Sequence, residues 1–125
     1  MKLLLDTHAL LWALARPGAL TPEARRRLQD PGNTVFVSVA SAWEMEIKRA
    51  LGKLETPSDL SEQIQHQRFT ELPVRLRHIE ALKNLPSLHR DPFDRLLVAQ
   101  ALADELVVVT RDARIRAYPI RSIEC

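Results

Sequence analysis

Residues 105–112 of this 125-residue chain are Glu-Leu-Val-Val-Val-Thr-Arg-Asp, a continuous apolar run that ends abruptly at two charged residues. A short run of this kind, rich in valine, predicts a strand that is buried on both faces, as strands of parallel sheets usually are. A second such run opens the chain, where Lys2-Leu-Leu-Leu leads directly into Asp6 and a helical pattern follows. The two runs therefore indicate an α/β protein with a buried central sheet.

Strand patterns and helix patterns alternate along the rest of the chain. Thr21-Pro-Glu is typical of a capped helix start, whereas Thr34-Val-Phe-Val-Ser is typical of a strand. The alternation predicts one domain, residues 1–125, with a mostly parallel sheet covered on both faces. We expect strands at 2–6, 34–38, 69–73, 105–110 and 118–123, and helices at 9–14, 22–30, 40–51, 59–67, 76–82 and from 92 to about 101.

The composition excludes several classes of protein. The only cysteine is Cys125, so neither an internal disulfide nor a thiolate metal cluster can form within one chain. No apolar stretch is long enough to span a membrane, and we expect a soluble cytoplasmic protein. The net charge of +2 and the pI of about 9.0 permit a nucleic-acid partner without requiring one.

Four acids from distant segments are predicted to meet at one edge of the sheet. Asp6 ends the first strand, and Asp112 follows the strand that ends at Thr110. Glu44 lies near the start of the helix after the second strand, and Asp94 lies in the first turn of the helix from residue 92. In parallel α/β sheets, strand ends and the starts of the following helices share the edge at which ligands bind.

Carboxylates gathered in one pocket repel each other, and a hard cation relieves that repulsion. Oxygen ligands without cysteine and without an evident histidine pair favour Mg²⁺ or Mn²⁺ over Zn²⁺. Such ions bind substrate phosphates and activate water, so hydrolysis of a phosphodiester is the natural reaction.

Each acid also has a purely structural interpretation. Asp6 can cap the next helix, and Asp112 can be a turn residue. Glu44 closes Ser41-Ala-Trp-Glu, which is a capping-box pattern, and Asp94 suits the positive end of a helix dipole. An acid at a helix start can cap the helix and bind a metal, so the two interpretations are compatible.

Five short motifs, in order along nearly the whole chain, resemble the PIN-domain toxins called VapC. These motifs are Leu4-Leu-Asp-Thr-His-Ala-Leu-Leu-Trp12, Ser41-Ala-Trp-Glu-Met-Glu-Ile-Lys48, Gly52-Lys-Leu54, His89-Arg-Asp-Pro-Phe-Asp-Arg95 and Val109-Thr-Arg-Asp112. No single motif is decisive, but the five together are highly specific.

The resemblance implies a three-layer α/β/α PIN fold and an endoribonuclease that depends on Mg²⁺ or Mn²⁺. It places the catalytic and metal-binding acids at Asp6, Glu44, Asp94 and Asp112, the four positions reached from the residues alone. Asp6 and Asp94 would be the central metal ligands, and the other two would complete the site directly or through water. The resemblance also implies a toxin that acts on RNA, forms a homodimer and is inhibited by a VapB-like antitoxin protein.

Four neighbours are candidates for supporting or substrate-binding roles. Thr110 can orient Asp112 or a water molecule, or can simply end its strand. Lys48 lies one helical turn after Glu44 and can pair with it or neutralise the site. Arg95 and Arg111 can hold phosphates or be solvated surface residues. We interpret His8 as a structural or substrate-rim residue rather than a metal ligand, and Trp12 and Trp43 as core or interface residues rather than platforms for base stacking.

Two other classes of function compete with the nuclease. A non-catalytic PIN-like module would bind protein or RNA, but the presence of all four acids argues against it. A phosphatase of the haloacid-dehalogenase type needs Asp-x-Asp after its first strand, and here the run is Asp6-Thr-His. A phosphoacceptor receiver needs an aspartate at the end of its middle strand, and Ser38 ends the second strand.

Overall fold

The computed structural model describes residues 1–125 and is built on a wholly parallel sheet. Its five strands have the spatial order β3-β2-β1-β4-β5. They are β1 (Lys2–Leu5), β2 (Thr34–Ser38), β3 (Thr70–Leu72), β4 (Val107–Thr110) and β5 (Ser122–Glu124). The predicted α/β fold with a parallel central sheet is confirmed.

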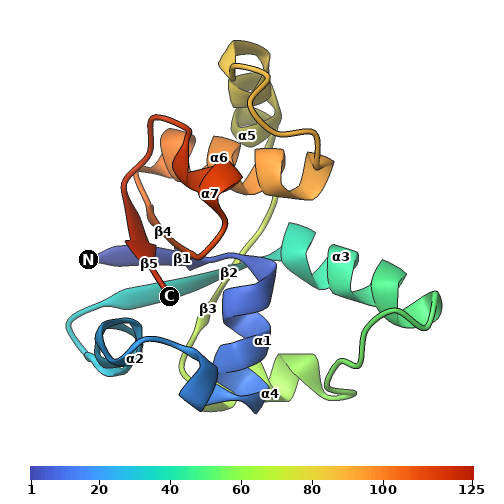
Figure 1. Cartoon of the computed structure of the whole chain (residues 1–125), viewed down its shortest axis with the longest axis vertical. Coiled ribbons are helices and arrows are strands. Elements are labelled where there is room, and N and C mark those ends of the chain that lie inside the picture. Colours follow the sequence, from blue (N-terminus) through green and yellow to red (C-terminus); the bar gives the residue numbers. More distant parts are fainter.

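Helices cover both faces of the sheet and make the molecule three layers thick (Figure 1). In that view α1, α2 and α4 lie below the sheet, and α5, α6 and α7 lie above it. The helices are α1 (Thr7–Ala15), α2 (Pro22–Gln29), α3 (Val39–Ala50), α4 (Leu60–His66), α5 (Leu76–Ala81), α6 (Pro92–Asp104) and α7 (Ala113–Arg116), with 3₁₀ turns at η1 (Pro17–Ala19) and η2 (Leu82–Asn84). None of them is both long and apolar enough to cross a membrane.

The central strand β1 explains why the first apolar run has no polar alternation. Leu3 and Leu5 pack into one hydrophobic cluster, on the side of α1, α2 and α4. Leu4 points to the opposite side and packs with residues of α6 and β4, such as Leu97 and Val108. All three leucine side chains are fully buried, so each face of β1 belongs to a separate core.

The carboxyl ends of β1 and β4 meet at the point where the order of the strands reverses direction. From β1 the chain builds outward to β2 and β3, and it then returns to the other side of β1 to form β4 and β5. Open α/β sheets bind ligands at such a switch point, in the crevice outside the strand ends. Asp6 follows β1 at this point, and Asp112 follows β4.

The last segment of the chain differs from the prediction. We expected a strand at 118–123, whereas β5 spans Ser122–Glu124 and a short helix, α7, precedes it. The Asp112 carboxylate accepts a hydrogen bond from the backbone N–H of Arg114 and thereby starts this single helical turn. The segment around Pro119 is a bend, because the backbone N–H of Ile120 bonds to the carbonyl of Tyr118 instead of to β4.

Candidate metal centre

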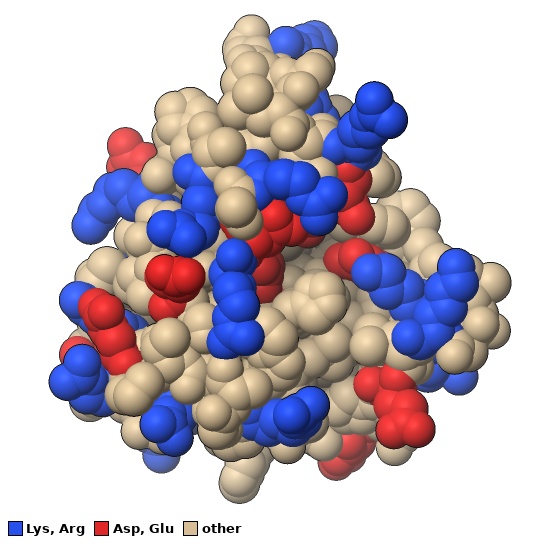
Figure 2. All heavy atoms as spheres, viewed as in Figure 1, with Lys and Arg blue, Asp and Glu red and all other residues tan.

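A cavity of about 560 Å³ opens at the carboxyl edge of the sheet, beside the switch point. All four predicted acids line it, and Asp91 is a fifth. Figure 2 shows acidic side chains at the bottom of a hollow in this face, with lysine and arginine side chains around its rim. The other lining residues are Thr7, His8, Trp12, Lys48, Arg111, Arg114 and Ile115.

Asp6 is held by hydrogen bonds at both carboxylate oxygens. Its Oδ1 accepts from the backbone N–H of Ala9 at 2.7 Å, so Asp6 is the N-cap of α1. Its Oδ2 accepts from the hydroxyl of Thr110 at 2.6 Å, and that bond joins the ends of β1 and β4. Burial raises the pKa of Asp6 and outweighs the two hydrogen bonds, which lower it.

Glu44 is almost fully buried, and each of its carboxylate oxygens also has a donor. The hydroxyl of Thr7 donates to Oε1 at 2.6 Å, and Nζ of Lys48 donates to Oε2 at 2.8 Å. The capping-box interpretation of Glu44 is wrong, because α3 begins after Ser38 rather than after Ser41. The strand β2 runs into α3 without a loop, and Glu44 therefore lies in the second turn, facing the cavity.

Asp94 lies in the first turn of α6 and bonds to a buried histidine. Its Oδ2 is 2.8 Å from Nε2 of His89. The other ring nitrogen of His89 accepts from the backbone N–H of Asp91, so Nε2 is the nitrogen that carries the proton and donates to Asp94. Asp91 is the N-cap of α6 and accepts from the backbone N–H groups of Phe93 and Asp94.

The pKa of Asp94 is the most strongly perturbed among the acids of the cavity. Burial, followed by the negative charges of Asp91 and Glu44, raises it to about 7. Asp112 behaves differently: burial alone would raise its pKa, but hydrogen bonds from the backbone and side chain of Arg114 lower it overall. The centre therefore contains carboxyl groups whose proton affinities differ because their surroundings differ.

Three side chains of the candidate centre lie close together. One nitrogen or oxygen atom from each of His89, Asp94 and Asp112 lies within 4.8 Å of the other two. Nε2 of His89 is 3.7 Å from Oδ2 of Asp112 as well as 2.8 Å from Asp94, and because it carries a proton it orients these carboxylates instead of binding a cation itself. With Asp6 and Glu44 in the same cavity, the donor set is dominated by carboxylate oxygen, which hard divalent cations prefer.

The family model of the PIN domain matches residues 3–120 of the chain. The chain belongs to the PIN-domain family. No curated protein matches its sequence.

Solved structures share the fold of this PIN domain at low sequence identity. VapBC2 from Rickettsia felis, bound to a DNA fragment from its promoter, aligns with a TM-score of 0.75 and 15% identity, over 99% of this chain and 98% of that chain. DNA-bound VapBC from Salmonella typhimurium aligns with a TM-score of 0.71 and 17% identity, over the same shares. FitAcB from Neisseria gonorrhoeae aligns with a TM-score of 0.56 and 17% identity, over 97% of this chain and 96% of that chain.

The basic side chains around the centre of the PIN domain differ in what they contact. Lys48 lines the cavity and pairs with Glu44, and the hydrogen bond to Glu44 is the main reason why the pKa of Lys48 is raised. Arg111 also lines the cavity, but its Nη2 donates to the carbonyl oxygens of Ala19 and Cys125. Arg95 does not line the cavity. Its Nη1 donates to the carbonyl of Pro86 and to the hydroxyl of Tyr118 instead.

The roles of Thr7 and His89 in this PIN domain were not predicted from the sequence. Thr7 was predicted only to precede a helix, whereas its hydroxyl bonds to Glu44 from 37 positions away in the sequence. His89 lies five residues before Asp94, across the bend that precedes α6, so no helical spacing connects them. The only signals were the acids in the same motifs, Asp6 before Thr7 and Asp91 and Asp94 after His89.

The raised pKa of Asp94 predicts how the stability of the folded protein depends on pH. Between about pH 4 and pH 7 the folded protein keeps a proton that the unfolded chain has lost, so stability in the absence of metal falls as the pH rises through this range. Asp94→Asn removes the charge and retains an oxygen that can accept from His89. In chelator at about pH 8, the variant should be more stable than the wild type by about 1–3 kcal/mol, since one pKa unit corresponds to about 1.4 kcal/mol.

Thermal melting of both proteins at several pH values checks this expectation. The difference in melting temperature should be small at about pH 4 and should grow up to about pH 8. A variant that is less stable than the wild type across the whole range would show that Asp94 is a stabilising, structural residue.

Proposed function

We propose that the chain is a single PIN domain, residues 1–125, that cleaves RNA with a divalent metal and acts as the toxin of a toxin–antitoxin pair. The observation that carries the proposal is the convergence of Asp6, Glu44, Asp94 and Asp112 in one cavity at the switch point of the sheet. The family supports a nuclease, and the donor set of the cavity supports a metal.

In this proposal Asp6 and Asp94 are the central ligands of Mg²⁺ or Mn²⁺, and Glu44 and Asp112 complete the site. Such an ion, when bound, polarises a phosphodiester and makes water more acidic. The contribution of the chain is to hold carboxylates where the ion and the phosphate need them. Each carboxylate oxygen of Asp6 and Glu44 has a donor in the structure, so these acids need little rearrangement before binding.

Thr110 acts in this proposal as a positioning residue for two acids. Its hydroxyl donates to Asp6, and its oxygen accepts from the backbone N–H of Asp112 at 3.0 Å. Lys48 both orients Glu44 and offsets negative charge next to it. Arg111 and Arg114 are the arginines placed to meet phosphates at the cavity, whereas the contacts of Arg95 favour a role in fixing the start of α6.

A non-catalytic binding module is the alternative to the nuclease. The cost of holding charged carboxylates in the cavity supports the nuclease. Burial and neighbouring charges raise the pKa values of both Asp6 and Asp94. A protein or RNA partner does not require such a cluster, whereas a divalent cation stabilises it directly.

Cleavage of RNA tests the proposal and separates it from the alternative. Purified protein should cleave a pool of structured and single-stranded RNA in Mg²⁺ or Mn²⁺. The cleavage should stop when excess chelator is added. Asp94→Asn and Glu44→Gln should each lower the rate by about 100-fold or more, the size of effect typical for groups that act on the transition state. Cleavage that continues at the wild-type rate in chelator or in both variants would contradict the proposed centre.

The matched control for Glu44→Gln is Glu46→Gln. Glu46 lies on the same helix, two residues later, but is exposed and pairs with Arg49 instead of lining the cavity. Its loss should leave the rate within about twofold of the wild type, as is usual for surface substitutions. An equal loss of activity in both variants would point to damage to α3 rather than to a catalytic carboxylate.

The proposed partners are a VapB-like antitoxin and a second copy of this chain. Similarity of fold to the VapBC complexes supports the antitoxin. An exposed apolar stripe along α3 supports a dimer: Val39, Trp43, Ile47 and Leu51 recur every four residues, and Trp43 is 62% exposed. We expect growth arrest when the chain is expressed alone, rescue by a co-expressed antitoxin, and a dimer in light scattering. A monomer, or expression without growth arrest, would contradict this part of the proposal.

A further inference from the structure

Trp12 is the main apolar surface in an otherwise polar cavity. Only two hydrophobic residues line the cavity, Trp12 and Ile115, and Ile115 is 1% exposed. The half-buried indole of Trp12 therefore provides the aromatic surface that a ligand of the acidic centre can reach. The sequence alone favoured a core or interface role for Trp12, and its place in the cavity supports a different role.

The indole is held in place by an arginine with few remaining degrees of freedom. The guanidinium of Arg111 lies over the ring of Trp12, 4.3 Å from its centroid. The same guanidinium donates to the backbone carbonyls of Ala19, in the η1 turn, and of Cys125, after β5. Arg111 thus connects α1, η1 and the end of β5, and it keeps its cationic guanidinium over the indole ring.

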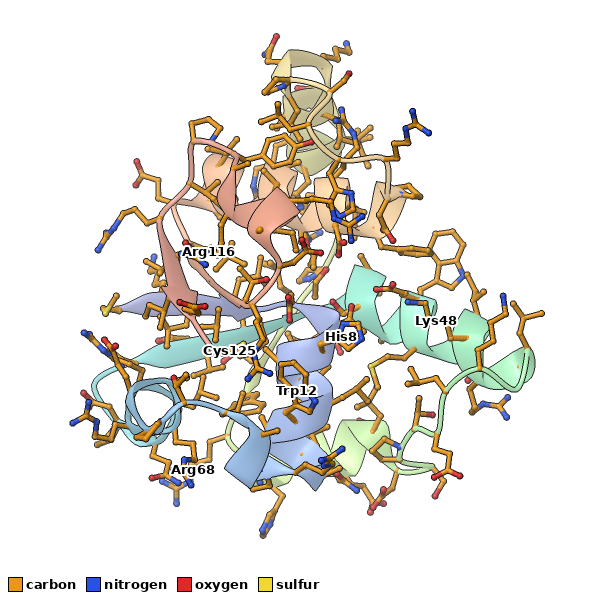
Figure 3. The ribbon with its side chains drawn as sticks, in the orientation of Figure 1. His8, Trp12, Lys48, Arg68, Arg116 and Cys125 are labelled. Carbon is orange, nitrogen blue, oxygen red and sulfur yellow. The ribbon has the colours of Figure 1, made fainter.

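His8 extends this aromatic surface by one helical turn. The rings of His8 and Trp12 are 5.8 Å apart and tilted by 43°. Figure 3 shows both side chains in front of α1, one turn apart. His8 is exposed and lines the same cavity, so the aromatic surface reaches from solvent toward the acids.

We propose that Trp12, backed by Arg111, binds a nucleobase of the RNA strand next to the phosphate that the acidic centre holds. The inference rests on the proposed nuclease function and specifies its substrate as unpaired RNA. In a duplex the bases are stacked on each other and are inaccessible to such a ring, whereas bases of single strands and loops can be turned out and stacked on aromatic side chains. Stacking is tolerant of sequence because every base has a π-face.

The polar lining of the cavity favours a nucleobase over a segment of a partner protein. A docked protein segment usually needs a continuous apolar floor, and here one indole lies among charged and polar residues. A nucleotide has the complementary arrangement, an aromatic ring joined to an anionic phosphate. Trp43, although more exposed, packs edge to face on Phe93 and does not line the cavity. Trp43 therefore lies outside the proposed base-binding surface.

The first test uses the fluorescence of Trp12 in protein that cannot cleave. The chain has two tryptophans, so Trp43→Phe leaves Trp12 as the only indole, and Glu44→Gln in the same protein blocks the reaction. In Mg²⁺, a mixed-sequence single-stranded RNA should quench the fluorescence saturably. The same strand without bases, and an RNA duplex, should bind at least about fivefold more weakly and leave the fluorescence unchanged, since stacking contributes roughly 5- to 150-fold per base.

Equal quenching by the strand without bases, or no quenching by any RNA, would overturn the proposal. Metal-dependent cleavage by the wild type separates this failure from failure of the nuclease assignment. If cleavage is normal and the fluorescence does not respond, only the base-binding role is wrong.

The second test uses kinetics. Trp12→Leu keeps apolar volume without a π-face, and Trp12→Phe keeps an aromatic ring. We expect Trp12→Leu to raise KM for single-stranded RNA about tenfold, with kcat within about twofold, and Trp12→Phe to lie between this variant and the wild type. Wild-type KM in Trp12→Leu would overturn the proposal. So would a variant that cleaves normally but no longer binds its antitoxin, since the surface would then serve a protein partner.

Discussion

The burial of several carboxylates next to one another is the constraint on which the rest of this structure depends. Five acids line one cavity at the ends of β1 and β4, and burial together with neighbouring charges raises the pKa of Asp94 to about 7. A fold gains no stability from such an arrangement, because each buried charge is costly unless it is compensated. The arrangement is understandable when the compensating charge is a divalent cation and the acids are kept in place for function.

The fold fixes the acids of the cavity by hydrogen bonds to rigid elements. Asp6 caps α1 and bonds to Thr110 at the end of β4, so the switch point itself fixes the acid. Glu44 is held by Thr7 and Lys48, and Asp94 by His89, which ties the start of α6 to the preceding bend. These donors leave the acids in positions that line the cavity.

The sequence predicted the sheet and the four acids because both follow from local patterns. Unbroken apolar runs mark strands buried on two faces, and parallel strands bring Asp6 and Asp112 to one edge. The contacts of His89 and Thr7 were not predictable, because they depend on how a bend and a helix start meet residues far away in the chain. The capping-box interpretation of Glu44 failed because β2 continues directly into α3, so Ser38 is the cap. The place of Trp12 depends on Arg111, whose anchors at Ala19 and Cys125 lie in other parts of the chain.

The most direct measurement of the central claim is calorimetric titration of the wild type and of Asp94→Asn with Mg²⁺ and Mn²⁺ at several pH values. Because Asp94 holds a proton below about pH 7, metal binding there must release this proton. The affinity of the wild type for the metal ion should therefore fall by about tenfold for each pH unit below about 7. Two buffers with different heats of ionisation should report this proton release, and Asp94→Asn should bind the ion much more weakly. An affinity that is independent of pH and equal in the two proteins would contradict the assignment of this cavity as a metal centre.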